Sequence, residues 1–286
     1  LAVTLIINDA TVHLHCDRFA VVHAEPKSGV NRPMLADRIR AMGAPHWLLL
    51  FGVIGSAWGI LYAMALPQDL RVAGQVYGLD ILAEFCVVTP DTAGFLRLII
   101  MWVLMSAAMM APTILPALAT YDDLSQTAPS THFGQLLAGY GLVWIGFSTF
   151  AALAQILLFS FGLVSLFGDS RSTALSSGLL LLAGLYQFSP VKEVCLSKCR
   201  APMMFFLQYW GEGPWRNGLR LGLVCLGCCW ALMLLAFVGG VMNLVFMGIA
   251  TLIMMLEKLP DFGRYLTKPL GVILVISSVK LLFGSG

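Results

Sequence analysis

Long apolar stretches without a charged side chain alternate along this chain with short polar connections. A helix needs about 20 such residues to cross the ~30 Å hydrocarbon core of a bilayer, and several of the stretches reach that length. The apolar pattern therefore predicts membrane-spanning helices. They lie at 47–66, 98–119, the middle of 133–168, 173–188, 221–256 and 266–283.

The stretch 221–256 is longer than one span requires, because a helix rising 1.5 Å per residue would reach about 54 Å there. Gly239 and Gly240 divide it, so we expect two helices joined by a tight turn. The predicted fold class is all-α, a multi-pass transmembrane helical bundle of about seven spans. Six spans would follow if 221–256 formed a single helix.

The distribution of Lys and Arg predicts the orientation of this bundle. Cytoplasmic connections of membrane proteins carry an excess of these residues. With seven spans and a cytoplasmic N-terminus, the cytoplasmic side holds five Lys or Arg in 18–40, five in 192–220 and three in 258–268, out of 17 in the chain. We therefore expect the N-terminus in the cytoplasm.

The composition agrees with a membrane protein. Hydrophobic residues make up 59% of the 286 residues and charged residues 11%, against roughly 25% charged in soluble domains. A net charge of +2 is too small to indicate a nucleic-acid partner. Residues 1–46 are polar and lack the apolar core of a signal peptide. We expect them to be disordered or an artefact of start-codon choice, ahead of one transmembrane domain over 47–284.

Hydrolytic and proton-pumping chemistry have no support in the sequence. It has no Ser/His/Asp arrangement, no glycine-rich phosphate loop, no HExxH motif and no row of carboxylates within the apolar stretches. Glu257 and Lys258 follow the sixth predicted span and are expected to form an ion pair at the membrane surface. We expect a protein that is not an enzyme.

A stripe of methionine and proline lies on the second predicted helix. Trp102, Met105, Met109, Pro112 and Pro116 fall on one face at 100° per residue. Methionine ordinarily fills gaps between packed helices, which is the more common use of such a stripe. Thioethers are also ligands that Cu(I) prefers, so the two methionines are candidate copper ligands as well.

Five of the seven cysteines form two groups. Cys195 and Cys199 share a face if their segment is helical, and Cys225, Cys228 and Cys229 share a face of the fifth predicted helix. Both groups lie at the cytoplasmic end in the predicted topology, where structural disulfides are not expected. Buried cysteine is often only a small apolar residue. A soft-metal or thiol role remains the alternative, because these spacings are less specific than paired C-x2-C zinc motifs.

Several motifs together resemble a bacterial family of predicted metal-binding integral membrane proteins. The resemblance covers roughly 45–284 and implies a multi-pass protein of the bacterial inner (cytoplasmic) membrane that binds a metal. It rests on MWVLMSAAMMAPTILP (101–116), YQFSPVKEVCLSKCRAP (186–202), GLRLGLVCLGCCWALM (218–233), GGVMNL (239–244) and EKLP (257–260).

The chain departs from this family pattern at two positions. The family often carries His where this chain has Leu221 and Lys198. If this chain has the metal site that the resemblance implies, that site has no imidazole at these two positions, which disfavours Zn(II) and Cu(II). An all-sulfur site suited to Cu(I) remains, or a member that has lost the metal.

The leading hypothesis is an inner-membrane protein that binds Cu(I) and hands it on or transports it. The predicted metal ligands are Cys195, Cys199, Cys225, Cys228, Cys229, Met105 and Met109. Its expected partners are the lipid bilayer and a metallochaperone or membrane complex. Two alternatives stay open: a non-catalytic structural or assembly subunit of a larger membrane complex, and a membrane thiol–disulfide protein.

Overall fold

The computed structural model describes residues 45–66, 85, 87–125, 132–259 and 262–284. The chain divides into two units, Leu1–Leu48 and Leu49–Gly286. The predicted polar segment 1–46 lies almost wholly outside the described residues. Everything below concerns the second unit, whose described residues are helical apart from turns and one isolated antiparallel bridge between Val164 and Ser170. The all-α fold class is confirmed for this part of the chain.

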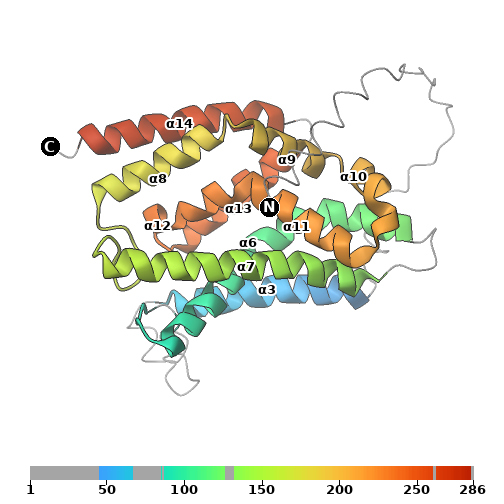
Figure 1. Cartoon of the computed structure of the whole chain (residues 1–286), viewed down its shortest axis with the longest axis horizontal. Helices are drawn as coiled ribbons and strands as arrows, with labels where there is room; N and C mark the ends of the chain where they lie inside the picture. Colours follow the sequence, from blue (N-terminus) through green and yellow to red (C-terminus); the bar gives the residue numbers. More distant parts are fainter. Residues whose placement is uncertain (1–44, 67–84, 86, 126–131, 260–261, 285–286) are drawn as a thin grey trace. The chain divides into compact units, whose positions relative to one another are not determined.

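The helices and their order along the chain are shown in Figure 1. They are α3 (Pro45–Met64), α6 (Thr92–Ser125), α7 (Phe133–Ser160), α8 (Thr173–Tyr186), α9 (Pro190–Arg200), α10 (Pro202–Tyr209), a 3₁₀ turn (Trp210–Glu212), α11 (Pro214–Leu234), α12 (Ala236–Gly239), α13 (Leu244–Lys258) and α14 (Gly263–Phe283).

Five helical segments among the described residues are long and apolar enough to cross a membrane: α3, α6, α7, α11 with α12, and α14. A sixth span results if α8 and α9, which meet at 62°, are counted as one. Helix α13 has 15 residues, about 22 Å at 1.5 Å per residue, and is shorter than the bilayer core. The membrane character is thus supported by five to six spans. The count of seven and the cytoplasmic N-terminus stay predictions.

The predicted break in 221–256 is confirmed. Helix α12 ends at Gly239, and Gly240 has φ +95°, a left-handed conformation that glycine adopts without strain. The side chain of Asn243 then accepts a hydrogen bond from the Phe246 N–H at 3.1 Å and caps α13. The chain therefore reverses here, and α13 returns beside α6.

Glycines hold α11 close against α7. A Cβ at Gly218 would collide with the backbone carbonyl of Leu136, and one at Gly222 would meet the side chain of Val143 at 2.9 Å. Small residues four positions apart let two membrane helices approach backbone to backbone. This contact fixes the rotation of α11 about its axis, and so the direction in which its other side chains point.

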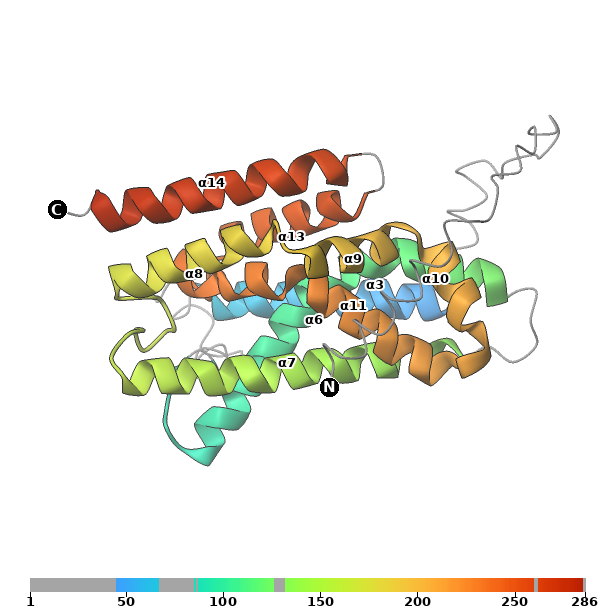
Figure 2. The ribbon, with the colours of Figure 1, turned by 45° about the horizontal axis from the view of Figure 1, so that its top comes forward.

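On the other side of α11, the short helix α9 lies against it, while α8 and α14 run side by side (Figure 2). The Ser278 hydroxyl donates to the Ser177 carbonyl across the α8–α14 pair at 2.8 Å. On α3, the Trp58 indole donates to the Ala108 carbonyl of α6 at 3.0 Å. Helices α7, α8, α9 and α13 pack against α11, and Met110 of α6 reaches Cys229 on it.

Candidate metal centre

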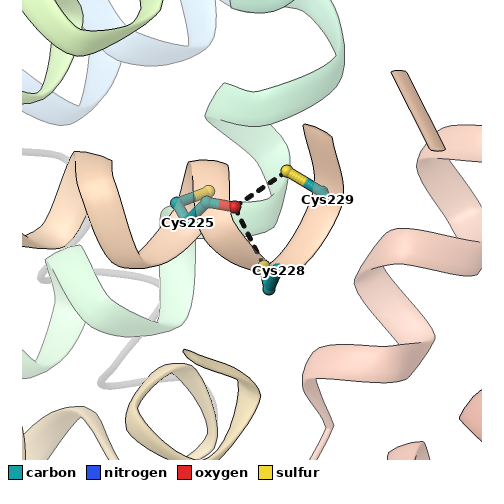
Figure 3. Close-up of side chains that lie close together, drawn as sticks. All are labelled: Cys225, Cys228 and Cys229. Carbon is teal, nitrogen blue, oxygen red and sulfur yellow. Dashed lines mark hydrogen bonds between the residues drawn. The ribbon is translucent and has the colours of Figure 1, made fainter. Parts of the chain in front are cut away.

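Three cysteines of α11 form a compact group of sulfur atoms. The sulfurs of Cys225, Cys228 and Cys229 all lie within 4.8 Å of one another (Figure 3). Each residue is at most 2% exposed. Positions three and four apart on a helix are neighbours, so the helix itself creates this group. We call these three residues the cysteine cluster.

The protons of two of these thiols are directed at the same backbone oxygen. Cys228 and Cys229 donate to the Cys225 carbonyl at 3.0 and 2.8 Å. A thiol that donates to a carbonyl is protonated. Metal binding requires thiolates, and these two hydrogen bonds are lost when the metal enters.

A thioether from α6 completes the sulfur surface. The Cys229 sulfur lies 3.5 Å from the Met110 sulfur, and Met110 is fully buried. The predicted thioether ligands Met105 and Met109 are buried in the same helix. The methionine seen in contact with the cluster, however, follows Met109 by one position, which is 100° around the helix, so the stripe chosen by periodicity left it out.

The two predicted cysteine groups do meet. On α9, Cys199 lies near Cys228 of α11. Cys195 packs on α11 at Gly227, where an added Cβ would lie 2.6 Å from the Cys195 sulfur. The missing side chain at Gly227 thus lets α9 approach, and Cys195 and Cys199 lie next to the cysteine cluster.

Lys258 at the end of α13 reaches the cluster. Its ammonium donates to the Cys225 sulfur at 3.1 Å and to the Thr113 hydroxyl at 2.7 Å. The Tyr140 hydroxyl lies 3.3 Å from the same sulfur. Cys225 is therefore the sulfur with an ammonium and a hydroxyl beside it, an environment suited to a thiolate. The sequence pattern identified neither Lys258 nor Tyr140.

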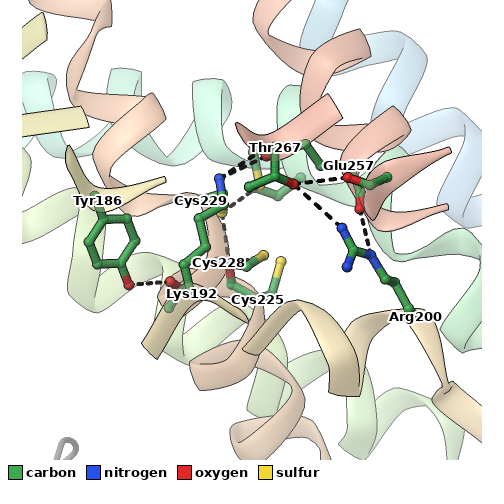
Figure 4. A network of polar contacts seen from close by, with 11 residues as sticks. Tyr186, Lys192, Arg200, Cys225, Cys228, Cys229, Glu257 and Thr267 are labelled. Carbon is green, nitrogen blue, oxygen red and sulfur yellow. Dashed lines mark hydrogen bonds and ion pairs between the residues drawn. The ribbon is translucent and has the colours of Figure 1, made fainter. Parts of the chain in front are cut away.

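The predicted surface ion pair between Glu257 and Lys258 is wrong. Consecutive helical residues point in different directions, and Glu257 instead pairs with Lys192 of α9 at 2.9 Å, both side chains being at most 2% exposed. Arg200 donates from Nε to the Glu257 carbonyl at 2.9 Å. This buried network joins α9 to α13 around the cysteines (Figure 4).

A cavity of about 80 Å³ opens beside the cysteines between α6, α9, α11 and α13. Cys199, Cys225 and Lys258 line it. Leu221 and Lys198, the two positions at which the resembling family often carries histidine, line the same cavity. Their side chains therefore face the space next to the thiols, which explains how residues 23 positions apart in sequence could belong to one site.

The chemistry of the site is that of a soft-metal centre. Within the described residues, the group of potential ligands that comes together contains only cysteine, without histidine or carboxylate. Thiolate and thioether sulfur bind soft metals such as Cu(I), and thiolates also bind Zn(II).

Comparison with known proteins agrees with this chemistry and with the metal-binding resemblance drawn from the sequence. The model of a copper chaperone family, PpoB2, matches residues 99–281, well over half of the chain and all of the elements that build the site. No curated protein and no solved structure matches the chain. On the strength of the family match, this chain belongs to the PpoB2 family of copper chaperones.

Proposed function

We propose that this protein is a membrane-embedded copper chaperone that binds Cu(I) at the cysteine cluster and passes it to a partner. One observation carries the proposal: three buried sulfurs lie within 4.8 Å of one another on α11. The Met110 sulfur 3.5 Å from Cys229 adds a thioether. The family match supports copper as the cargo.

Charge supports Cu(I) at this position. A monovalent ion bound by three thiolates carries a net charge of −2, which is costly to bury unless a positive group compensates it. The Lys258 ammonium, 3.1 Å from the Cys225 sulfur, is such a group. The Tyr140 hydroxyl at 3.3 Å can donate a hydrogen bond to the same sulfur.

Copper transfer needs a site that a partner can reach. Cys199 is half-buried, unlike the three cysteines of the cluster, and we assign it to the path by which copper arrives or leaves. Cys195 is buried and remains a proposed ligand. Met105 and Met109 of α6 remain proposed thioether ligands along the same path. The family resemblance implies the bacterial inner membrane as the protein's location. The distribution of Lys and Arg favours an orientation with the cysteines towards the cytoplasm.

Metal analysis of the purified protein tests the proposal. The protein is loaded with Cu(I) or Zn(II) under reducing conditions, desalted and analysed for metal, beside a variant with Cys225, Cys228 and Cys229 replaced by Ser. We expect copper in the wild type and its loss from the variant. Zinc in place of copper, or copper content unaffected by the replacements, would overturn it. A thermal unfolding curve checks that the variant is folded.

The thiol–disulfide alternative has one observation in its favour, the adjacency of Cys199 and Cys228. Disulfide exchange proceeds by attack of a thiolate on a disulfide sulfur, so these two thiols would alternate between reduced and oxidised forms. Alkylation of the protein isolated from cells separates the two functions. A copper chaperone gives free or metal-protected thiols, whereas a redox protein gives a cross-linked fraction that responds to reductant.

A further inference from the structure

A second cavity lies where α8 and α9 meet and α14 begins. Its volume is about 500 Å³, within the range of about 300–1,000 Å³ that small-molecule sites usually have. Among the described residues, it shares no lining residue with the cavity beside the cysteines. We call it the α14 cavity, and it is separate from the site proposed for copper.

Gln187 brings a buried amide to this cavity. The residue lines the cavity and is 4% exposed, and neither its Oε1 nor its Nε2 has a hydrogen-bond partner among the described residues. Gly271 of α14 allows this position, because a Cβ there would lie 2.8 Å from the Gln187 Cβ. A buried amide without partners is costly. A ligand that both donates and accepts hydrogen bonds would therefore be stabilised beside Gln187.

Side chains of both charges line the α14 cavity. Arg264 and Lys268 lie exposed on successive turns of α14, and neither forms an ion pair within the described part of the chain. Glu193 of α9 lines the cavity as well. Its carboxylate is 3.8 Å from Arg200, and its side chain is 66% exposed, so it stays accessible to a second cation. A ligand that carries an anionic and a cationic group matches this lining.

The surface of α14 beyond the cavity is apolar. Val272 and Ile276 follow Lys268 at four-residue spacing and are exposed. Positions four apart lie on one face of a helix, so the cations at the start of this candidate span are followed by an apolar face. Phe188, which lines the cavity, is exposed too. A phospholipid has the same order of chemistry, with a charged headgroup at the membrane surface and apolar chains below it.

We propose that the α14 cavity binds a phosphate ester that carries an ammonium group, and that the bilayer supplies it as the headgroup of phosphatidylethanolamine. Arg264 and Lys268 bind the phosphate oxygens. Glu193 accepts hydrogen bonds from the ammonium, and the Gln187 amide bonds to the headgroup through both its donor and its acceptor. The acyl chains lie along the exposed apolar face of α14. This lipid site is independent of copper binding.

Native mass spectrometry of the full-length protein in detergent measures the affinity for the first added lipid. The probes are dioleoyl phosphatidylethanolamine, phosphatidylcholine and phosphatidylglycerol, together with soluble O-phosphoethanolamine. Phosphatidylcholine has the same charges but no ammonium N–H to donate, and phosphatidylglycerol has no cationic group. We expect phosphatidylethanolamine to bind about tenfold more tightly than either of these lipids. It should also bind more tightly than the soluble compound, because acyl chains add apolar contact.

Two results would overturn the assignment of the ligand. Equal affinities for the three lipids would exclude recognition of the ammonium headgroup. Equal affinities for phosphatidylethanolamine and soluble O-phosphoethanolamine would exclude the bilayer as the source of the ligand.

Variants of the lining residues test how the headgroup is held. We expect Arg264→Gln to lower the affinity for phosphatidylethanolamine by about tenfold and Gln187→Leu to lower it by about threefold or more. Glu193→Gln should abolish the preference for phosphatidylethanolamine over phosphatidylcholine. Lys280→Gln removes a charge from the same helix outside the cavity and should leave the affinity unchanged.

Thermal unfolding without added lipid checks that each variant is folded. Gln187→Leu should fold normally, because it replaces an amide that has no hydrogen-bond partner among the described residues with an apolar side chain. An unchanged lipid affinity in folded Gln187→Leu would overturn the proposal. A loss in Lys280→Gln as large as that in Arg264→Gln would also overturn it, since lipid would then bind by charge alone.

Discussion

The Lys258 ammonium lies 3.1 Å from the Cys225 sulfur, so the last residue of α13 touches the cysteine cluster of α11. The contact joins a charge to a sulfur across 33 residues of sequence. Lys258 also donates to the Thr113 hydroxyl of α6 at 2.7 Å. The short helix α13 therefore contacts both α6 and α11 at the site.

Replacing Lys258 with Met should weaken copper binding. Methionine has a side chain of similar length but no charge, so the negative charge of a copper-loaded cluster is left uncompensated. We therefore expect the Cu(I) affinity to fall by about 10- to 100-fold. Competition with a Cu(I)-specific chelator measures this loss. Lys280→Gln, near the far end of α14, serves as a charge control and should leave the affinity unchanged; equal losses in both variants would contradict a local role.

Met110→Leu should lower the Cu(I) affinity by about tenfold, whereas Met109→Leu and Met105→Leu should have smaller effects. The reason is the position of the Met110 sulfur, 3.5 Å from that of Cys229. The three substitutions are matched in chemistry and helix, so a packing effect would appear in all of them. X-ray absorption of the loaded protein gives the number of sulfur neighbours of copper. An unchanged number and affinity in Met110→Leu would exclude the thioether from the site.

Gly227→Ala should destabilise the protein by about 1–3 kcal/mol, because its Cβ would lie 2.6 Å from the Cys195 sulfur and push α9 away from α11. Gly248→Ala is the control, since nothing lies within 4 Å of its added Cβ. Alanine in that helix interior should be neutral or stabilise by about 0.5–1 kcal/mol. Thermal unfolding in detergent compares the two. Similar midpoints for both variants would show that the α9–α11 contact tolerates the methyl group.

Glu257→Gln should cost about 3–5 kcal/mol, because it leaves the Lys192 ammonium buried without its counter-charge. The double variant Lys192→Met with Glu257→Gln should recover much of this loss, since no charge then remains buried. A double-mutant cycle on unfolding free energies measures the coupling between the two residues. If the losses in unfolding free energy of the two single variants add up to that of the double variant, the two side chains have no interaction energy.

The sequence predicts the local features of this site well. The spacing of Cys225, Cys228 and Cys229 on an uncharged helix already places three sulfurs on one face, and Gly239 with Gly240 marks the end of that helix. These features depend on the 3.6-residue period and on backbone conformations that glycine favours. The structure reproduces both.

The contacts between helices are less accessible to sequence. Met110 and Lys258 reach the cluster because α6 and α13 have a particular rotation relative to α11, and a helical period fixes which residues share a face but not which face meets a neighbour. Pro112 and Pro116 lie inside α6 and interrupt its hydrogen bonds, which further weakens an argument from an ideal helix. The surface pair expected of Glu257 and Lys258 fails because consecutive helical residues point in different directions, and the two side chains instead contact Lys192 and Cys225.

The Cys225 carbonyl accepts hydrogen bonds from the thiols of Cys228 and Cys229, and this gives copper exchange a proton stoichiometry. Each of these thiols must lose its proton to bind copper and regain one to release it. Loading therefore acidifies the surroundings of the site, and unloading consumes protons. An acidic environment at the point of delivery supplies these protons and favours release of copper from the chaperone. A near-neutral pH at the point of loading favours copper binding.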